Sequence, residues 1–353
     1  MKRRDILAGA ALAPAALAAP ALASGNLEWK MPTSFPSRAP GVGTNAVSFA
    51  ERVNKMAGGR LTLKVYSGGE LVPPFAVEDA VQQGTAEIGH STPYYNAGKN
   101  SALHFFSSIP FGLTATELPA WLRYGGGQDL WNDLYAERNL VPFYSGNSTV
   151  QAAGWFKSEL TSVADLSGLN MRIAGLGGEA MRKLGVNAVM LPPPEIFPAF
   201  QSGAIDAAEW VGPMLDQAFG LNKVAKYCYA PAFHEPSAGL EVIVNKDAWG
   251  ELSDDLKAIV EEAALATSVE TVAQFDYFNA QAFAQLKKAG VEFKTLPADI
   301  LTALRGAVAE VMEEQATANG DFAKVMESYN AYLALARDYG AAFSGPSIMQ
   351  RLG

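Results

Sequence analysis

Apolar positions along the chain switch repeatedly between the spacing of helices and the spacing of strands. Residues 46–56 place apolar side chains on one helical face, and Gly58-Gly59 ends that pattern. Residues 61–66 then alternate apolar and polar side chains, as a half-buried strand does. Short helix and strand patterns follow one another as far as residue 210. This alternation predicts an α/β fold with a largely parallel sheet.

Three segments in the middle of the chain give more specific expectations. Residues 170–173 have the pattern of a strand, which is followed by a glycine loop at Gly175–Gly178 and a helix over 179–184. The loop contains part of a dinucleotide-binding fingerprint, but it lacks the third glycine, so we interpret it as a tight strand-to-helix turn. Residues 205–210 predict a buried strand, and Met190-Leu191 predicts a strand end.

The last third of the chain is dominated by long helical patterns. An amphipathic stretch from Asp254 to Ala289 contains neither proline nor glycine, and Ser253 is placed to cap its start. A strand over 291–296, a helix over 298–318 and a helical tail over 321–343 follow. No linker separates two halves, so we expect the chain to cross between two domains more than once. A ligand cleft between two lobes is the typical result of that arrangement.

The N-terminus has the features of an export signal. A basic cluster at Lys2–Arg4 precedes an apolar stretch, Ile6–Leu22, which ends in a small-residue cleavage pattern. Residues 1–23 are therefore expected to be a signal peptide, which places the mature protein in the periplasm. The pair Arg3-Arg4 indicates the twin-arginine route, and an ordinary Sec signal is the alternative. A membrane anchor is disfavoured, because two prolines interrupt a run shorter than the roughly 20 apolar residues that a span needs.

Composition narrows the classes of partner. Removal of residues 1–23 leaves about 330 residues, which favours two domains. It also removes three of the 27 basic and one of the 36 acidic residues, so the net charge moves from −9 to −11. Such a chain is poorly suited to nucleic acid or to an anionic membrane. The single cysteine, Cys228, is expected to be a buried core thiol, with a catalytic thiol as the remote alternative.

Known catalytic signatures are missing from the sequence. The three histidines, His90, His104 and His234, form no His-Glu-x-x-His motif. Neither a Gly-x-Ser-x-Gly elbow nor a Walker loop is present. The sequence therefore favours a binding protein over an enzyme.

Arg172 is the first candidate for a binding residue. It lies within the apolar strand pattern of residues 169–173, where a guanidinium requires a partner because burial of an unpaired charge is costly. One interpretation is a structural salt bridge. The other is a ligand carboxylate, whose two oxygens match the planar guanidinium. Position alone leaves these two interpretations equally open.

Carboxylates after two buried segments form the second candidate site. Glu209 ends the apolar run of residues 205–208 beside Trp210, and Glu235 lies in the loop 233–236. Two carboxylates and a backbone carbonyl suit a hard cation such as Ca²⁺ or Na⁺. A solvated acid at a helix start is the alternative for Glu209. Polar contacts are also expected from residues near strand ends, namely Tyr94, Tyr95 and Asn147.

Several segments together resemble a known receptor family. They are residues 67–71 (Ser-Gly-Gly-Glu-Leu), 81–89 (Val-Gln-Gln-Gly-Thr-Ala-Glu-Ile-Gly), 109–114, Leu166–Arg172 and Pro194–Glu209. In order and spacing they are similar to the solute receptors of TRAP (tripartite ATP-independent periplasmic) transporters, the DctP-type binding proteins. The resemblance covers nearly the whole mature chain.

The resemblance implies a two-lobed α/β clamshell with a long hinge-spanning helix, which corresponds to Asp254–Ala289. The first lobe would comprise residues 24–147 plus about 237–268. The second would comprise residues 148–236 plus about 269–353, including the C-terminal helix.

The resemblance also implies ligand roles. Arg172 would bind the substrate carboxylate. Most of the family has Asn where this chain has Trp210, so that contact does not carry over. The chain is instead similar to a subgroup that binds 2-oxo or 2-hydroxy monocarboxylates together with a metal ion, Ca²⁺ or Na⁺. The implied metal ligands are Gln151, Glu209, the Trp210 carbonyl and Glu235. The implied substrate contacts are Tyr94, Tyr95, Asn147, Gln151, Arg172 and Trp210.

The expected function is a receptor that delivers pyruvate, 2-oxobutyrate, lactate or a relative to membrane permease subunits. The subgroup carries an acidic stretch after Gly212-Pro213, of which this chain keeps only Asp216, so the substrate stays open. A metal-free receptor for a larger or aromatic acid is the first alternative. A periplasmic metal-dependent lyase or hydrolase using Glu209 and Glu235 is the remote one. The C-terminal helix leaves a homodimer open.

Overall fold

A computed structural model describes residues 26–352 of the chain. The predicted signal peptide, residues 1–23, lies outside the described residues. Within residues 26–352, no helix combines the length and the apolar character that a membrane span requires.

The chain opens with a small parallel unit. β1 (Leu27–Pro32) pairs in parallel with β2 (Leu61–Tyr66), and α1 (Val42–Ala57) connects them. Gly58 ends α1 in the left-handed conformation, with φ 59°, which glycine adopts without a steric cost. The alternating pattern of β2 buries Leu61 and Leu63, as the sequence predicts.

A three-stranded antiparallel sheet forms the centre of the first lobe. Its order is β3 (Ile88–Ser91), β10 (Gly239–Asn245) and β4 (Leu140–Asn147). Every residue of the central strand β10 is buried. Since β10 comes from a part of the chain about 90 residues after β4, this sheet brings distant segments together.

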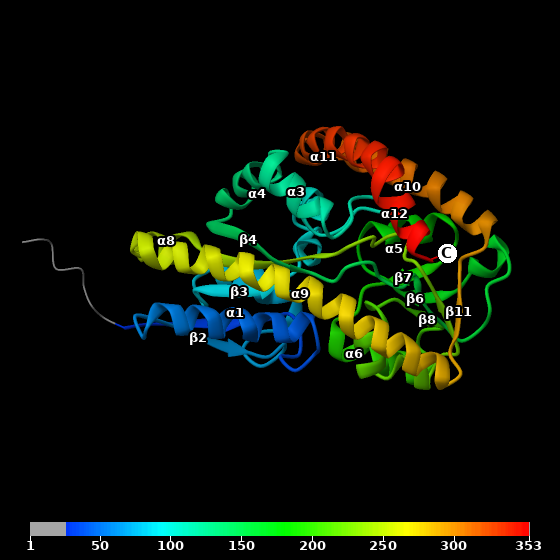
Figure 1. The fold of residues 1–353 in the computed structure, drawn as a ribbon, viewed down its shortest axis with the longest axis horizontal. Helices are drawn as coiled ribbons and strands as arrows, with labels where there is room; N and C mark the ends of the chain where they lie inside the picture. Colours follow the sequence, from blue (N-terminus) through cyan, green and yellow to red (C-terminus); the bar gives the residue numbers. More distant parts are fainter. Residues whose placement is uncertain (1–25, 353) are drawn as a thin grey trace, which may run out of the picture.

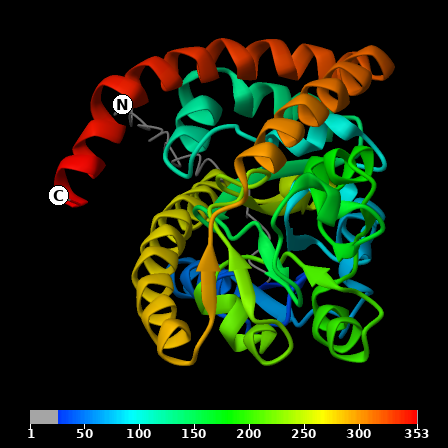
Figure 2. The same ribbon diagram turned by 90° about the vertical axis from the view of Figure 1, so that its right-hand side faces the viewer.

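A six-stranded sheet forms the second lobe (Figure 2). Its order is β11 (Glu292–Lys294), β9 (Tyr227–Tyr229), β5 (Gly154–Phe156), β8 (Ala207–Ala208), β6 (Asn170–Arg172) and β7 (Asn187–Val189). β5 is antiparallel to both of its neighbours, whereas β6 is parallel to β7 and β8. The expectation of a largely parallel fold is therefore wrong in part, because β5 runs against both of its neighbours and the three-stranded sheet of the first lobe is antiparallel throughout.

Helices cover the two sheets and join them (Figure 1). Their bounds are α2 Val77–Gln82, α3 Glu117–Tyr124, α4 Gly127–Ala136, α5 Gly175–Lys183, α6 Pro193–Ser202, α7 Pro213–Ala218, α8 Lys246–Glu251, α9 Asp254–Lys288, α10 Ala298–Ala318, α11 Gly320–Tyr339 and α12 Gly345–Leu352. Two short 3₁₀ helices, η2 (Pro93–Asn96) and η3 (Ser101–Phe106), follow β3.

The long helix α9 connects the two lobes, as predicted. Near its middle, Thr271 accepts a hydrogen bond from the Asn45 side chain of α1 at 2.6 Å. Further along, Asn279 accepts one from the backbone of Met214 in α7 at 2.9 Å. The two-lobed α/β architecture with a connecting helix is thus confirmed.

The predicted lobe boundaries remain a prediction. The chain crosses between the sheets near residues 147–154 and 229–239, as well as along α9. However, α11, which we assigned to the second lobe, packs on η3 of the first, with the Phe322 and Phe105 ring centroids 4.7 Å apart.

Three local predictions need correction. α5 begins at Gly175 rather than at residue 179, because the glycines that were expected to form a loop form the first turn of the helix. Only Ala207–Ala208 of the predicted strand 205–210 pairs with neighbours. Met190-Leu191 lies outside β7. Cys228 is buried, as predicted.

Candidate binding site between the two lobes

The predicted site residues converge on one buried region between the sheets. Tyr94 and Tyr95 lie on η2, Asn147 ends β4, and Gln151 lies in the crossing between β4 and β5. The second lobe contributes Arg172 at the end of β6, Glu209 and Trp210 after β8, and Glu235 in the loop after β9. All eight residues are between 0 and 9% exposed. Because β6 and β8 are parallel neighbours, their carboxyl ends bring Arg172 and Glu209 to one sheet edge.

Arg172 is paired and also has donor capacity left. Its Nη1 donates to the Glu209 carbonyl oxygen and to Glu209 Oε2, both at 2.6 Å. Its guanidinium lies 5.3 Å from the centre of the Trp210 ring. Arg172 Nη2 is buried and has no hydrogen-bond partner among the described residues. The predicted salt bridge is therefore present, and it leaves one nitrogen of the guanidinium available for a ligand.

Two acceptor oxygens on residues of the predicted site also lack donors. Gln151 Oε1 and Glu235 Oε2 are buried and lack a hydrogen-bond partner within residues 26–352. The backbone holds these two residues together, since the main-chain N–H of Gln151 donates to the main-chain carbonyl oxygen of Glu235 at 3.2 Å. Two carboxylates, an amide oxygen and the adjacent Trp210 carbonyl form a donor set that fits a hard cation.

Electrostatics at the site follow from its burial. Burial raises the pKa of Glu235, and the Glu209 charge raises it further, while Arg172 acts in the opposite direction. Burial likewise raises the pKa values of Tyr94 and Tyr95, which keeps both hydroxyls protonated as donors. The site thus holds two carboxylates, one guanidinium and two phenols away from water.

The side-chain amide of Asn147 is fixed through its oxygen, while its nitrogen lacks an acceptor. Its Oδ1 accepts a hydrogen bond from the Thr149 amide at 2.8 Å. Its Nδ2 is buried and has no partner in the described part of the chain. A donor of this kind suits an anionic or carbonyl oxygen.

Two further buried residues lie at the site, and the sequence alone assigned them no contact there. His234 is 2% exposed, and its Nε2 lies 3.9 Å from Glu209 Oε1. Asp216 is fully buried and accepts hydrogen bonds from Trp155 Nε1 at 2.7 Å and from the Val211 amide at 3.0 Å. Asp216 therefore supports the loop that carries the Trp210 carbonyl. Burial raises the pKa of Asp216 to about 7.

The family model for bacterial extracellular solute-binding proteins, family 7 (DctP), matches residues 34–319. The chain belongs to this family. Family 7 proteins are solute receptors, which agrees with a buried site assembled from two lobes.

Several proteins that are similar to this chain have known ligands. The chain is 40% identical over 342 residues, 94% of each sequence, to a monocarboxylate 2-oxoacid-binding periplasmic protein of Nostoc sp. PCC 7120. A TRAP solute-binding protein of Bordetella bronchiseptica RB50, a dimer with calcium and picolinate in one of its active sites, is 35% identical with a TM-score of 0.91. That comparison covers 93% of this chain and 97% of the other.

A second solved structure carries a different cation. The TRAP solute-binding protein of Pseudoalteromonas atlantica T6c, with bound sodium and pyruvate, is 32% identical with a TM-score of 0.89. The comparison covers 92% of this chain and 99% of that protein.

A cavity lies beside two residues of the predicted site. It has a volume of about 510 Å³ and is lined by Tyr94 and Tyr95 together with His104, Gly175 and Asn319.

Proposed function

We propose that this protein is an extracytoplasmic receptor that binds a small 2-oxo or 2-hydroxy monocarboxylate together with a Ca²⁺ or Na⁺ ion. Pyruvate, 2-oxobutyrate and lactate are the candidate substrates. The observation that carries the proposal is the set of unpaired buried atoms on the predicted site residues: the donor Arg172 Nη2 and the acceptors Gln151 Oε1 and Glu235 Oε2. Donors for an anion and acceptors for a cation are what a metal-assisted acid site requires.

The organic acid is held by the donors. Arg172 Nη2 and Asn147 Nδ2 donate to its oxygens, and the protonated Tyr94 and Tyr95 hydroxyls add further donors. The Trp210 ring provides an apolar surface beside the guanidinium. These groups would bind a carboxylate and a neighbouring oxygen, with the apolar part of the acid against Trp210.

The cation is held by the acceptors. Gln151 Oε1, Glu209, the Trp210 carbonyl and Glu235 would be its ligands. When bound, the ion supplies positive charge between the protein carboxylates and the anionic acid. Without it, two carboxylates and one guanidinium leave one negative charge in excess, which disfavours an anion.

Residues from both lobes are needed for a complete site. Tyr94, Tyr95 and Asn147 come from the first lobe, and Arg172 and Glu209 come from the second. A ligand that contacts both sets favours the closed form, because the open form lacks half of the contacts.

A thermal-shift screen of the mature protein against 2-oxo and 2-hydroxy acids, with and without a chelator, tests this proposal. A ligand that binds only the folded state must raise the melting temperature. A shift with pyruvate or 2-oxobutyrate that the chelator removes supports it. A shift that survives the chelator indicates the metal-free receptor for another acid. Conversion of the acid to product would indicate a lyase or hydrolase instead, whereas stoichiometric binding without turnover supports a receptor.

The proposed partners are the membrane permease subunits of a TRAP transporter, to which the closed receptor would deliver its ligand. We also propose export to the periplasm through the twin-arginine route, on the basis of Arg3-Arg4. Replacement of both arginines with lysine should block export of a reporter fusion, and unchanged export would indicate the Sec route.

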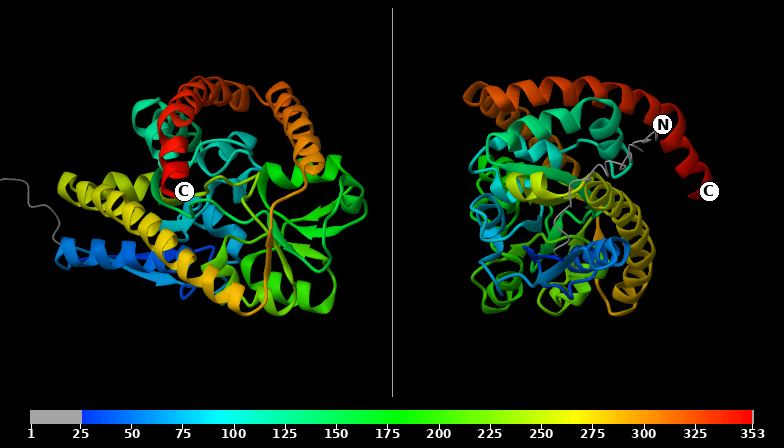
Figure 3. Two further views of the ribbon diagram at one scale, coloured as in Figure 1. Left: turned by 45° about the vertical axis from the view of Figure 1, so that its right-hand side comes forward. Right: turned by 90° about the vertical axis from the view of Figure 1, so that its left-hand side faces the viewer.

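The C-terminal arm supports a homodimer. After α11, a π-helical segment over Gly340–Ser344 and then α12 extend away from the body (Figures 2 and 3). Every residue of 341–352 is exposed, among them Phe343, Ile348, Met349 and Leu352. Exposed apolar side chains in this number are typical of an interaction surface.

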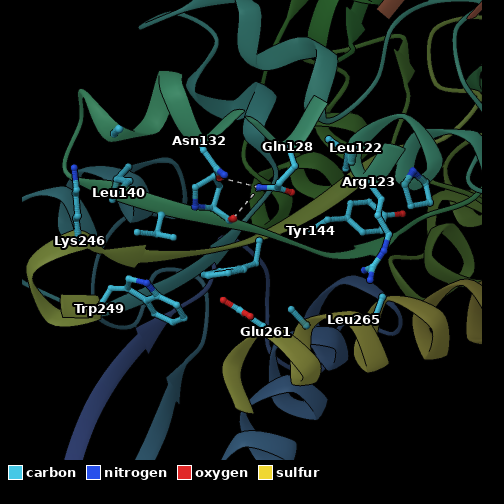
Figure 4. Close-up of a pocket in the computed structure, with 16 residues that line it drawn as sticks. Leu122, Arg123, Gln128, Asn132, Leu140, Tyr144, Lys246, Trp249, Glu261 and Leu265 are labelled. Atoms are coloured by element: carbon cyan, nitrogen blue, oxygen red, sulfur yellow. Dashed lines mark hydrogen bonds between the residues drawn. The ribbon is translucent and has the colours of Figure 1, made fainter. Parts of the chain in front are cut away.

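A matching apolar surface lies on the first lobe. A cavity of about 500 Å³ is bounded by α3, α4, β4, α8 and α9, with Leu122, Phe143, Trp249 and Leu265 in its wall (Figure 4). We propose that the arm of a second copy covers this surface. Truncation after Tyr339 should convert a dimer to a monomer in light scattering. A monomeric full-length chain would exclude the dimer without affecting the binding site.

A further inference from the structure

The cavity beside Tyr94 and Tyr95 is larger than a short acid needs. Its volume of about 510 Å³ is within the range of roughly 300–1,000 Å³ that is typical of pockets for whole small molecules. Its wall comes from residues 94–104, residues 173–190 and the junction of α10 with α11. Of the residues assigned above to the acid and the cation, only the two tyrosines belong to this wall. The cavity therefore adjoins the proposed acid site without being used by it.

His104 gives this cavity a buried polar atom without a partner. The residue is 4% exposed, and its Nδ1 has no hydrogen-bond partner in the part of the chain from residue 26 to residue 352. Buried polar atoms in folded proteins are nearly always hydrogen-bonded. Burial lowers the pKa of His104 to about 4, so the ring is neutral at pH 7 and has one nitrogen that donates and one that accepts. A hydroxyl group, which both donates and accepts, suits such a ring in either tautomer.

The start of α5 lies against the same nitrogen. A Cβ at Gly175, which lines the cavity, would be 3.8 Å from His104 Nδ1. α5 begins at Gly175, so the first backbone N–H groups of this helix have no partner within it. An unpaired ring nitrogen and backbone donors free of helical partners therefore flank one part of the cavity.

The charges around the cavity favour a neutral polar occupant. Lys99 forms a salt bridge with Asp79. The other two charged residues of the wall, Glu179 and Arg182, have opposite signs. A second carboxylate on a ligand would face the negative charge of Glu179, and a purely apolar chain would leave His104 Nδ1 unpaired. A neutral chain that carries hydroxyl groups avoids both costs.

Tyr94 links this cavity to the proposed acid site. Burial raises the pKa of Tyr94, and the charges of Glu235 and Glu209 raise it further, so these carboxylates lie near its hydroxyl. On the other side, the Tyr94 ring stacks on the ring of His104, with the centroids 6.5 Å apart. The chain of an acid longer than pyruvate would therefore run along Tyr94 towards His104.

We propose that this cavity takes the hydroxylated tail of a sugar acid, so that the receptor also binds longer, polyhydroxylated 2-hydroxy or 2-oxo monocarboxylates. His104 Nδ1 forms a hydrogen bond with one tail hydroxyl, and the first amides of α5 donate to tail oxygens. The inference rests on the proposed function in one respect, namely that Arg172 holds the carboxylate end of the acid.

Calorimetric titration of the Ca²⁺-loaded mature protein with a matched pair of acids tests the inference. Gluconate and 2-hydroxyhexanoate share the same carbon chain and the same 2-hydroxy acid end, but only gluconate carries hydroxyl groups along its tail. We expect gluconate to bind at least about tenfold more tightly, because a hydrocarbon tail leaves buried polar atoms unpaired. Equal affinity for the two acids, or tighter binding of 2-hydroxyhexanoate, would overturn the inference.

Two variants locate the tail. His104→Phe keeps an aromatic ring beside Tyr94 but removes the nitrogens, so gluconate affinity should fall at least about fivefold while lactate affinity stays within about twofold. Gly98→Leu is a second variant that leaves the buried residues intact. Gly98 lines the cavity, and a Cβ there meets no atom within 4 Å. The added side chain should likewise weaken gluconate and spare lactate. Equal losses for both acids in the two variants would contradict a tail site.

The short acids separate this inference from the proposed function. If lactate or pyruvate binds with Ca²⁺ but gluconate does not, the receptor function stands and the tail site is wrong. If gluconate binds equally well after chelation and loses affinity in His104→Phe, the tail site stands and only the proposed cation is wrong. If none of these acids binds, both proposals fail.

Discussion

Two buried charge clusters in this protein have opposite balances. In the core of the first lobe, the fully buried Glu78 contacts both Arg138 and Lys99, whose side chains are 15% and 35% exposed. In the cleft, Glu209 and Glu235 share a single guanidinium, and all three groups are 1–2% exposed. In the core cluster, the negative charge of Glu78 is therefore balanced by two basic side chains that are partly exposed to solvent.

The difference shows how a structural ion pair can be distinguished from a binding site. Unpaired atoms do not separate the two clusters, since Arg138 Nη1 lacks a hydrogen-bond partner among the described residues, as Arg172 Nη2 does. The charge balance separates them: a buried carboxylate whose charge is balanced needs no ligand, whereas the excess negative charge in the cleft calls for a cation.

Replacement of Arg172 with Ala should abolish measurable binding of a 2-oxo acid. The variant loses the donor for the ligand carboxylate and leaves Glu209 buried without its partner. The expected loss is at least about 100-fold in affinity, as for breaking a buried ion pair. Calorimetric titration of the purified variant measures it.

Arg138→Ala is the matched change in the core cluster. Glu78 would lose one of its two cations, so the melting temperature should fall, but 2-oxo acid affinity of the folded protein should stay within about twofold. A similar loss of affinity in both variants would mean that the loss with Arg172→Ala reflects general destabilisation.

Glu235→Gln should weaken cation binding and stabilise the ligand-free protein. The change removes one cation ligand and the excess charge, so Ca²⁺ affinity should fall about 10- to 100-fold. The melting temperature of the metal-free protein should rise, because a buried carboxylate with a raised pKa disfavours folding near neutral pH. Unchanged Ca²⁺ affinity would exclude Glu235 from the cation site.

Glu241→Gln should alter only the pH dependence of stability. Glu241 is a buried carboxyl of the first lobe whose Oε2 accepts a hydrogen bond from the Tyr135 hydroxyl at 2.8 Å. Burial raises its pKa from 4.5 to about 8. The folded state therefore binds the Glu241 proton more tightly than the unfolded state does. Protonated Glu241 thus stabilises the fold fully below about pH 4.5, and this contribution is lost as the pH rises to about 8.

Urea denaturation at pH 5 and pH 8 measures this effect. The free energy of unfolding of Glu241→Gln should fall less between these values than that of the wild type, by on the order of a few kcal/mol. Pyruvate affinity should be unchanged. An identical decline in both proteins would show that Glu241 does not titrate in this range.

The parts of the fold that could be predicted are those with long periodic patterns. α9 and α10 agree with their predicted bounds to within one residue, because neither contains an internal proline or a helix-ending glycine pair. The six-stranded sheet was harder, since most of its strands span two or three residues, too few to show alternation. The antiparallel direction of β5 depends on the crossing between the lobes, which no local pattern reveals.

The site was predictable by residue type but not by pairing. Arg172 was identified because a guanidinium within an apolar strand needs a partner. Its bond to Glu209 joins residues 37 positions apart, so only the neighbouring strands β6 and β8 reveal it. His234 lies in a short loop with no periodic pattern. Its unpaired nitrogens become visible only when the three-dimensional surroundings are known.

The most direct test of the central claim is a calorimetric titration of pyruvate into chelator-treated mature protein, repeated after Ca²⁺ is restored. We expect no measurable binding without the cation and one molecule bound per chain with it, because the cation balances the excess of carboxylates in the cleft. Equal affinity in both titrations would mean that Glu209 and Glu235 do not hold a cation needed for the acid.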